Sequence, residues 1–391
     1  TGFMGIQLME RLGIDPKVLH LNEGHMVFSA LGLIRREMFR RGKLWGFDEP
    51  QVADLNKNHR KDAEEKGLTF EQSQKAVSER IGFTSHTPVP AGNEIFEIMD
   101  VKRFLQPYAD SIGVSLDELI NSKTGVASHP DPNQPRPVFN LTEFAFWLAR
   151  YVGGVSKRNQ EVGAEKYGRP DFDYITNAVH RLFWQHPELQ TLLEKALSDF
   201  NRKNPQEQLK GGIDKLSFNE MKKLLASIPD EDLSQVKQFM RDWGVQFIGD
   251  HVKKEYNADL SLDPKAFTIV IARRFAPYKR AELILEIALE IIKYAKSRGV
   301  KAEIVLAGKA HPEDQEGKRI IQRIHSRMKN PDLAGHVFFV QGYDMDVSKA
   351  LQALASIWLN NPELSKEASA TSGMKAEMNG VLNVSTRDGW P

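Results

Sequence analysis

The chain has 391 residues, 41% of them hydrophobic, which is enough for two domains of ordinary size, each with its own core. Lys and Arg together number 53 and Asp and Glu 52, so no overall field favours nucleic acid or an anionic membrane as a partner. The absence of cysteine excludes disulfides, thiolate metal sites and cysteine nucleophiles, and it fits a reducing, cytoplasmic setting.

The first residues, TGFMGIQLMERLGID, show neither the charged region nor the apolar region of a secretory signal. The longest apolar runs contain glutamates and are too short to span a membrane. We therefore expect a cytoplasmic protein. Because the chain starts at Thr1 and stops at Pro391 without obvious terminal elements, we also expect a piece of a longer protein.

The first half of the chain alternates short apolar runs with polar turns and helical patterns, which is typical of parallel α/β units. Residues 18–22 and 81–84 are predicted strands, and a helix is predicted over VFSALGLIRREMFRRG, which follows the first of them. The stretch SHPDPNQPRP, residues 128–137, predicts a loop that joins neither a helix nor a central strand, because proline lacks the backbone donor.

The second half repeats this alternation. Strands are predicted at 268–272, 303–307, 337–340, 357–359 and 381–384. Residues 184–252 carry charged segments with helical spacing and few strand signals, which predicts helical packing around a domain boundary. The fold class predicted is therefore α/β, with doubly wound sheets in domains 1–177 and 178–391.

Polar clusters fall where strands feed into loops, and this is where open α/β sheets bind ligands. RRFAPYKR places Arg273, Arg274, Lys279 and Arg280 directly after a β-branched run and before a helical pattern. Four cations beside the positive end of a helix can hold phosphate groups, although a solvated basic turn has the same composition. Both interpretations stay open on this motif alone.

Two further clusters carry histidines. LNEGH contains Glu23 and His25, and SHTPVPAG contains His86 in a loop stiffened by prolines. Single histidines are most often structural, yet residues at the ends of successive strands can converge on one crevice. The spacing matches neither H-E-x-x-H nor a carboxylate cluster, so a metal site has weak support.

EASATSGMKAEMNG, residues 367–380, places Lys375 one turn into a predicted short helix. Thr371, Ser372 and Gly373 can present hydroxyls and backbone N–H groups to an anion, and a lysine there can form an imine with a carbonyl cofactor. A capped helix with an exposed lysine fits the spacing equally well. Neither G-x-G-x-x-G nor G-x-x-x-x-G-K-[ST] nor G-x-S-x-G occurs, so dinucleotide, P-loop and nucleophile-elbow interpretations have no support.

Six blocks, taken in order, resemble the α-glucan phosphorylases, the family of glycogen and maltodextrin phosphorylases, and look closest to its bacterial and archaeal branch. The blocks are HLNEGH, FTSHTPVPAG, ARRFAPYKRAELI, AGKAHP, QGYDMDVSKAL and EASATSGMKAEMNGVLNVSTRDGW. The resemblance implies two Rossmann-like domains facing a cleft, the GT-B glycosyltransferase type, with both domains incomplete at the chain ends.

The family's reaction is retaining phosphorolysis, in which inorganic phosphate releases a terminal α-1,4 glucosyl unit of a glucan as glucose 1-phosphate. Its cofactor is pyridoxal 5′-phosphate, bound as an imine to the lysine that matches Lys375, and the cofactor's phosphate takes part in proton transfer. Two adjacent phosphates demand dense positive charge around them. Members are commonly homodimers, although no self-complementary surface is evident in the sequence.

The resemblance assigns roles residue by residue. The catalytic residues that it implies are His86, Arg274 and Lys279. The cofactor-binding residues are Lys375, Arg273, Lys279, Tyr343, Thr371 and Ser372. The substrate-binding residues are Glu23, His25, His86, Asn177, Glu367, Ser369 and Ala370. No metal ligand is implied.

Some positions differ from the family pattern. Alanine stands at 178 and 370 where glycine is usual, Asn159 stands where histidine is usual, and Asn93-Glu94 replaces a histidine-aspartate pair. Ala370 matters most, because glycine lets the backbone approach a ligand closely. Two alternatives therefore stay open: a nucleotide-sugar-dependent glucan synthase of similar fold, and a non-catalytic glucan-binding relative.

Overall fold

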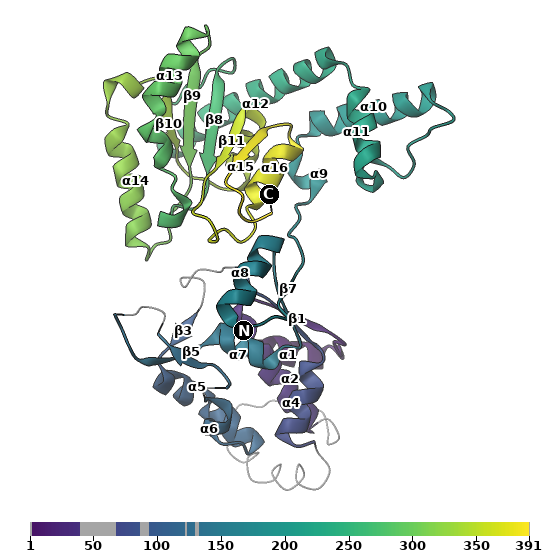
Figure 1. Ribbon diagram of the computed structural model, residues 1–391, viewed down its shortest axis with the longest axis vertical. Helices are drawn as coiled ribbons and strands as arrows, with labels where there is room; N and C mark the ends of the chain where they lie inside the picture. Colours follow the sequence, from purple (N-terminus) through teal and green to yellow (C-terminus); the bar gives the residue numbers. More distant parts are fainter. Residues whose placement is uncertain (1, 40–67, 87–93, 122, 130–132, 391) are drawn as a thin grey trace. The chain divides into compact units, whose positions relative to one another are not determined.

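The computed structural model describes residues 2–39, 68–86, 94–121, 123–129 and 133–390 (Figure 1). The chain divides into two compact units. The first comprises Thr1–Asn177, Ser365–Ser369 and Trp390, and the second Ala178–Leu364 and Ala370–Gly389. None of the helices in the described ranges combines the length and the apolar composition needed to cross a bilayer.

The main sheet of the first unit has four parallel strands in the order β1-β2-β6-β7. These strands are β1 (Leu19–Asn22), β2 (Ile81–Thr84), β6 (Tyr151–Gly154) and β7 (Asp173–Tyr174). The accompanying helices are α1 (Gly2–Arg11), α2 (Phe28–Phe39), α4 (Phe70–Ser78), α7 (Leu141–Leu148) and α8 (Lys157–Tyr167). Leu21, Phe83 and Val152 from three of the strands lie in one buried core with apolar residues of these helices.

A second, antiparallel sheet in this unit has the order β3-β5-β4. It consists of β3 (Ile95–Phe96), β5 (Pro137–Asn140) and β4 (Val126–Ser128), with α5 (Ile98–Ile112) and α6 (Leu116–Leu119) nearby in the chain. The loop prediction for residues 128–137 is wrong at both ends, because Ser128 ends β4 and Pro137 begins the middle strand. A proline is tolerated as the first residue of a strand.

The second unit contains a five-stranded parallel sheet with the order β10-β9-β8-β11-β12. The strands are β8 (Phe267–Ala272), β9 (Ala302–Ala307), β10 (Val337–Val340), β11 (Ile357–Asn360) and β12 (Leu382–Ser385). Each of the predicted strands of this half is present, within one residue at either end. The order reverses at β8, as in a doubly wound sheet, so ligand-binding loops are expected beyond the carboxyl ends of β8 and β11.

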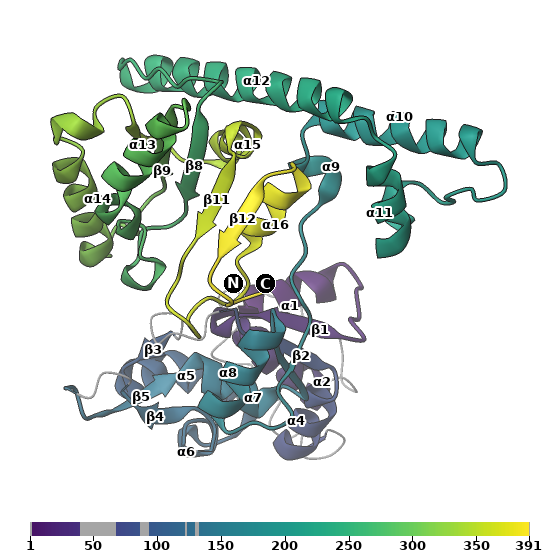
Figure 2. The same ribbon diagram turned by 45° about the horizontal axis from the view of Figure 1, so that its top comes forward.

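Helices cover both faces of this sheet, because alternate side chains of each strand point to opposite faces. Ile269 and Ile271 of β8 pack in the core that includes residues of α13 (Ala288–Ser297) and α14 (Gln315–Arg327). Val270 and Ala272 of the same strand pack in the core that includes residues of α12 (Asp230–Tyr256), α15 (Met345–Leu354) and α16 (Thr371–Met378). Figure 2 shows α12 above α15 at the top of this unit, and the two helices are in contact.

The segment between the first unit and this sheet is helical. It contains α9 (Arg181–Trp184), α10 (Pro187–Lys203), α11 (Phe218–Ala226) and α12, with a 3-10 turn at Ile213–Lys215. Ser217 caps α11 in a reciprocal capping box with Glu220, which stabilises the start of that helix. α10 and α12 pack on each other through Leu189, Leu192 and Met240.

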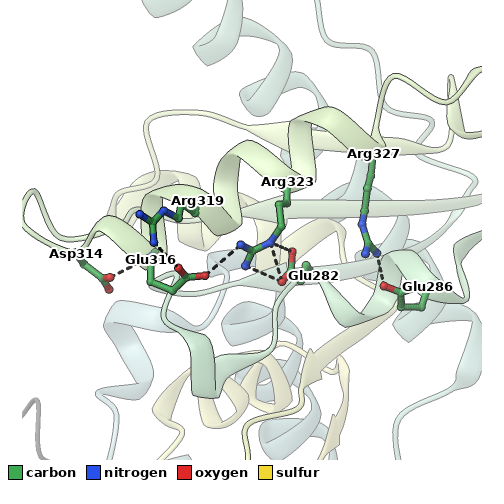
Figure 3. A network of polar contacts seen from close by, with 8 residues as sticks. Glu282, Glu286, Asp314, Glu316, Arg319, Arg323 and Arg327 are labelled. Atoms are coloured by element: carbon green, nitrogen blue, oxygen red, sulfur yellow. Dashed lines mark hydrogen bonds and ion pairs between the residues drawn. The ribbon is translucent and has the colours of Figure 1, made fainter. Parts of the chain in front are cut away.

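A network of ion pairs joins α14 to the 3-10 turn Leu283–Glu286 and the residue before it (Figure 3). Arg323 binds Glu282 at 3.0 Å and Glu316 at 3.1 Å, and Arg327 binds Glu286. Arg323 is 44% exposed in its side chain, and exposed pairs of this kind contribute little individually. The arginines in this network neutralise carboxylates of the same surface, so we assign the network to the stability of this helical layer.

Candidate active site

The residues after β1 and β2 meet at the carboxyl edge of the first unit's parallel sheet. The backbone N–H of His86 donates a hydrogen bond of 2.6 Å to Oε1 of Glu23, and Nδ1 of His86 lies 3.6 Å from the same oxygen. Burial raises the pKa of Glu23, and burial also lowers the pKa of His86. The pair therefore places an imidazole that is neutral near pH 7 beside a carboxyl group that ionises at a higher pH than usual.

His25 lies close by in the chain, on the 3-10 turn Gly24–Met26, and it is exposed. Asn177 follows β7 and is half-buried, and its backbone N–H donates to the carbonyl oxygen of Val155 at 2.9 Å. Glu23, His86 and Asn177 thus follow three strands of one parallel sheet and lie at its carboxyl edge.

The segment Ser365–Ser369 joins this unit from the far end of the sequence. Oγ of Ser156, the N-cap of α8, donates to the carbonyl oxygen of Ala368 at 2.7 Å, and Arg158 donates to Oγ of Ser365 at 2.6 Å. Glu367 and Ser369 are 8% and 6% exposed. These bonds hold the segment that contains two predicted substrate residues at the loop after β6 and the start of α8.

Asn159, where the family usually has histidine, has a structural task in this fold. It is 3% exposed, and its Oδ1 accepts the backbone N–H of Val155 at 3.0 Å. The Asn159 backbone N–H donates to Oγ of Ser156 at 3.1 Å. The amide therefore shapes the loop between β6 and α8, an acceptor role that a histidine nitrogen can also fill.

The basic turn lies after β8 in the second unit. Arg273 is 8% exposed, whereas Arg274 is exposed and Lys279 is half-buried. Arg280 is directed elsewhere, because its guanidinium donates to the carbonyl oxygens of Asn361 at 2.8 Å and Pro362 at 2.9 Å. Arg273, Arg274 and Lys279 are the other cations of this turn.

The prediction that a helix starts directly after this turn is wrong. Two 3-10 turns, Pro277–Lys279 and Leu283–Glu286, follow the cations, and α13 begins only at Ala288. Pro277 starts the first of these turns, and Arg280 closes it in a left-handed conformation with φ of 49°. Any anion held here is therefore bound chiefly by side chains and not by the amino end of an α-helix.

Tyr343, Thr371 and Ser372 complete the second unit's set. Tyr343 follows β10, and its hydroxyl donates to Oγ of Ser348 at 3.1 Å. Burial raises the pKa of Tyr343, and the nearby charge of Arg273 opposes this change. Thr371 and Ser372 open α16, where Oγ of Ser372 accepts the indole N–H of Trp358 at 3.2 Å and keeps its own hydroxyl proton available as a donor.

Ala370 immediately precedes α16 and has φ of 60° and ψ of 42°, a left-handed conformation that glycine adopts without strain. Ala370 is 6% exposed. It also marks a crossing between the units, because Ser369 belongs to the first and Ala370 to the second. Alanine in place of glycine at position 370 therefore adds a methyl group and also strains the backbone.

Lys375 lies in the middle of α16, and its ammonium nitrogen is 3.5 Å from the centroid of the Trp184 ring. Burial lowers the pKa of Lys375, which increases the neutral amine needed for attack on a carbonyl. Both figures draw α9 beside α16, and the two helices are in contact. Within the described residues this lysine has no carboxylate partner, unlike a solvated surface charge in an ion pair.

Trp184 is a residue that sequence reasoning missed. It lies 191 positions before Lys375 in the chain, and no motif connects the two. Its aromatic character at the start of the helical segment is a weak signal for core packing and carries no information about the lysine. Only the tertiary structure places the indole ring under the amine.

The predicted residues therefore form two groups. One group, at the edge of the first unit's sheet, consists of Glu23, His25, His86, Asn177, Glu367 and Ser369. The other, in the second unit, consists of Arg273, Arg274, Lys279, Tyr343, Ala370, Thr371, Ser372 and Lys375. No group of His, Cys, Asp and Glu in the described ranges has the arrangement of a metal site. The first group offers hydrogen-bonding partners for hydroxyls, and the second offers an amine and cations.

Comparison with known proteins agrees with this chemistry. Residues 186–390 match the family model for carbohydrate phosphorylases. The whole chain is 32% identical to maltodextrin phosphorylase of Thermococcus litoralis and 30% identical to glycogen phosphorylase of Aquifex aeolicus, and it covers 43% and 52% of those proteins. Glycogen phosphorylase of Mycobacterium tuberculosis is 28% identical over 96% of the chain, which covers 41% of that protein. The chain spans about half the length of these relatives, and it belongs to the carbohydrate phosphorylase family.

Proposed function

We propose that this chain provides the glucan-binding and cofactor-binding residues of an α-glucan phosphorylase. The reaction is the phosphorolysis of terminal α-1,4-linked glucosyl units of glycogen, starch or maltodextrin to α-glucose 1-phosphate, with retention of configuration. The proposal includes a GT-B arrangement of the two units, a cytoplasmic location and a homodimer. It rests on family membership and on the two groups of residues described above.

The observation that carries the proposal is the environment of the Lys375 amine. The side chain is half-buried, it packs on the Trp184 ring at 3.5 Å, and burial lowers its pKa. A surface lysine that serves only solubility does not require burial under an aromatic ring. A lysine that reacts with a carbonyl cofactor must lose its proton first, and burial favours the neutral amine. These features fit pyridoxal 5′-phosphate attached at Lys375.

When bound, the cofactor supplies a phosphate group that exchanges a proton with the substrate phosphate. The chain's own part is to hold two phosphates close together against their mutual repulsion. Arg273 is buried near Tyr343 and is suited to bind the phosphate of the cofactor. Arg274 is exposed and is suited to bind the substrate phosphate, which enters and leaves with each turnover. Lys279 adds a third cation, and the hydroxyls of Thr371 and Ser372 add hydrogen-bond donors at the start of α16.

The first unit's residues bind the sugar. The departing glucosyl unit develops positive charge at its anomeric centre, so donors and acceptors must fix the ring in place while that charge appears. His86 is neutral because burial lowers its pKa, and its ring offers a nitrogen to a sugar hydroxyl. Asn177, which follows β7 at the same edge of the sheet, offers its side-chain amide. In the segment Ser365–Ser369, Glu367 offers a hydrogen-bond acceptor and Ser369 a donor. The Glu23 carboxylate orients His86 by accepting the His86 backbone N–H.

The test is reduction of the protein with borohydride after incubation with pyridoxal 5′-phosphate, followed by peptide mapping. We expect one pyridoxyl adduct, on Lys375. Lys375→Arg keeps the charge and must abolish the adduct, whereas Lys349→Arg, the matched control on α15 in the same unit, must leave it unchanged. An adduct spread over many surface lysines, or none on Lys375, refutes the cofactor assignment.

A second assay separates phosphorolysis from the remaining alternatives. We expect phosphate-dependent release of glucose 1-phosphate from maltodextrin and no response to nucleotide sugars. The strained Ala370 favours one competing function, a non-catalytic glucan-binding relative, because a methyl group now occupies a position where glycine is usual. Cofactor attachment and glucan binding without phosphorolysis, both in the parent and in Ala370→Gly, indicate that second function.

A further inference from the structure

Asn379, the C-cap residue directly after α16, lies at the centre of the contacts around Lys375. It is 2% exposed, and its side chain uses both of its polar atoms. Nδ2 donates to the carbonyl oxygen of Lys375 at 2.9 Å and to that of Trp184 at 2.9 Å. Oδ1 accepts the backbone N–H of His186 at 2.8 Å. One buried amide thus binds the backbones of the lysine and of the tryptophan that covers it.

The segment held in this way has little regular structure of its own. α9 ends at Trp184, Gln185 is extended, and α10 begins at Pro187. Besides the two bonds that this segment makes to the Asn379 side chain, the side chain of Gln185 donates to the carbonyl oxygen of Met378 at 2.8 Å. The position of the Trp184 ring against the lysine therefore depends on bonds to the last residues of α16, and Asn379 supplies most of them.

We propose that Asn379 is a positioning residue for Lys375, which holds Trp184 over the amine and so fixes the amine's direction and its exclusion from water. The proposal rests on the proposed function, because it assumes that this amine is the one that takes the cofactor. Asn379 touches neither substrate nor cofactor in this role. It acts only through the two carbonyl groups that it binds.

A simple helix cap is the competing explanation. Asn379 also follows the last turn of α16, and a cap stabilises the helix without changing the chemistry of a side chain one turn earlier. The two explanations differ in what happens to Lys375 when the amide is removed. If Asn379 positions Trp184, its loss exposes the amine to water. If it only caps the helix, its loss lowers stability and leaves the reactivity of the amine unchanged.

Several titratable groups lie near this end of α16: His186, Glu188, Asp346 and Lys349 line one pocket together with Trp184 and Asn379. Lys237 on α12 donates to the carbonyl oxygen of Asn379 at 2.7 Å, and Lys349 on α15 lies 3.8 Å from the centroid of the Phe183 ring. Burial is the cause of the lowered Lys375 pKa. A variant that admits water should therefore move that pKa upward, toward the ordinary lysine value of about 10.4.

The experiment compares the parent with Asn379→Ala and with Gln185→Ala. Gln185→Ala is the matched control, because it removes one side-chain bond between the same two segments and leaves the carbonyls of Trp184 and Lys375 bound to Asn379. Lys375 is labelled with acetic anhydride over a range of pH, with exposed Lys254 on α12 as the reference in the same sample, and the peptides are quantified by mass spectrometry. Attachment of pyridoxal 5′-phosphate is measured in parallel.

We expect the labelling midpoint of Lys375 in Asn379→Ala to rise toward the ordinary lysine value, which lowers the neutral amine at a fixed lower pH by about tenfold for each pH unit of the rise. Cofactor attachment should slow by a similar factor, and Gln185→Ala should match the parent. Folded Asn379→Ala with the parent's midpoint and attachment rate overturns the proposal. If Asn379→Ala does not fold, Asn379→Ser, which keeps an acceptor for the His186 N–H, must show the same upward shift.

Failure of the proposed function has a different signature. A parent protein that attaches no cofactor at Lys375 contradicts the proposed function. The acetic anhydride midpoints still test the positioning role, because that reagent needs only the free amine. Equal midpoints in the parent and in both Asn379 variants contradict positioning even where the cofactor attaches normally.

Discussion

The carboxylate of Glu23 and the backbone N–H of His86 are 2.6 Å apart, so the residue after β1 holds in place the residue after β2. Glu23 itself has φ of 67° and ψ of 164°, a conformation otherwise typical of glycine. Such strain persists only where the surrounding structure compels it, and it is frequent at functional sites. The strained glutamate and the oriented histidine therefore support a binding edge at this end of the sheet.

Glu23→Gln should leave His86 in place but weaken glucan binding, because the amide keeps an acceptor and loses the charge. The pKa of Glu23 is higher in the folded protein than in the unfolded chain. Just above the ordinary glutamate pKa the native protein therefore holds a proton that the unfolded chain has released. The stability of the parent consequently falls as the pH rises from the unfolded-state pKa to the folded-state pKa. The free energy of unfolding of the variant, relative to the parent, should increase as the pH rises above the ordinary glutamate pKa of about 4.3. Urea titrations at several pH values measure this free energy, with Glu71→Gln on α4 as the control. The same pH dependence in both variants contradicts a raised pKa at Glu23.

Ala370→Gly should stabilise the protein. The left-handed conformation costs a residue with a side chain about 1–2 kcal/mol, and glycine returns about 0.5–1 kcal/mol of that through the entropy of the unfolded chain. The net gain is therefore about 1 kcal/mol or less. Ala376→Gly, in the interior of the same helix, should instead lose about 1 kcal/mol or more. Thermal unfolding distinguishes the two, and a loss of the same size in both variants excludes strain at Ala370.

How far the sequence predicts this structure depends on the range of the interactions involved. Arg273 and Tyr343 are found at strand ends because the strands of a parallel sheet are marked by short apolar runs. β3, with two residues, and β4, with three, are too short to give such a signal, and β5 begins with a proline. The sequence therefore does not predict the small antiparallel sheet.

The candidate site shows the same limit. Lys375 and its helix follow from local spacing, whereas Trp184 and Asn379 meet through hydrogen bonds across 195 positions of sequence. Ala370 differs from the glycine of the family pattern, and the sequence indicates only that a ligand can approach the backbone less closely there. Its left-handed backbone was not anticipated, because φ depends on how the chain leaves one unit and enters α16.

Gly244→Ala should destabilise the second unit. A Cβ at Gly244 of α12 would lie 2.7 Å from the carbonyl oxygen of Ala350 on α15, which is backbone and cannot rotate away. Gly249 lies in the same helix, and its Cβ would meet its nearest neighbour, the carbonyl oxygen of Leu260, at 3.4 Å. Gly249→Ala should therefore gain up to about 1 kcal/mol of helix propensity, while Gly244→Ala should lose about 1–3 kcal/mol by overpacking. Opposite shifts of the urea midpoint confirm the close approach of the two helices, and two gains contradict it.

Lys237 should make the stability of this unit depend on pH above neutrality. Burial lowers the pKa of Lys237 to about 8, while a lysine in the unfolded chain titrates near its ordinary value of about 10.4. Between these two values the unfolded chain binds a proton that the native protein has released, so stability rises with pH across this window. Below about pH 8 both states hold the proton, and the native protein bears the cost of a buried charge, on the order of 3 kcal/mol.

Lys237→Met removes this titration and, at every pH, the hydrogen bond to the Asn379 carbonyl oxygen. We expect the free energy of unfolding of the parent, relative to that of Lys237→Met, to increase by about 3 kcal/mol between about pH 7.5 and pH 10.5. Lys254→Met, an exposed position on the same helix, is the control and should follow the parent. Parallel curves for the parent and Lys237→Met exclude the buried charge. Since the Asn379 side chain also binds the Lys375 carbonyl oxygen, titration of Lys237 acts on a residue that already holds the candidate cofactor lysine.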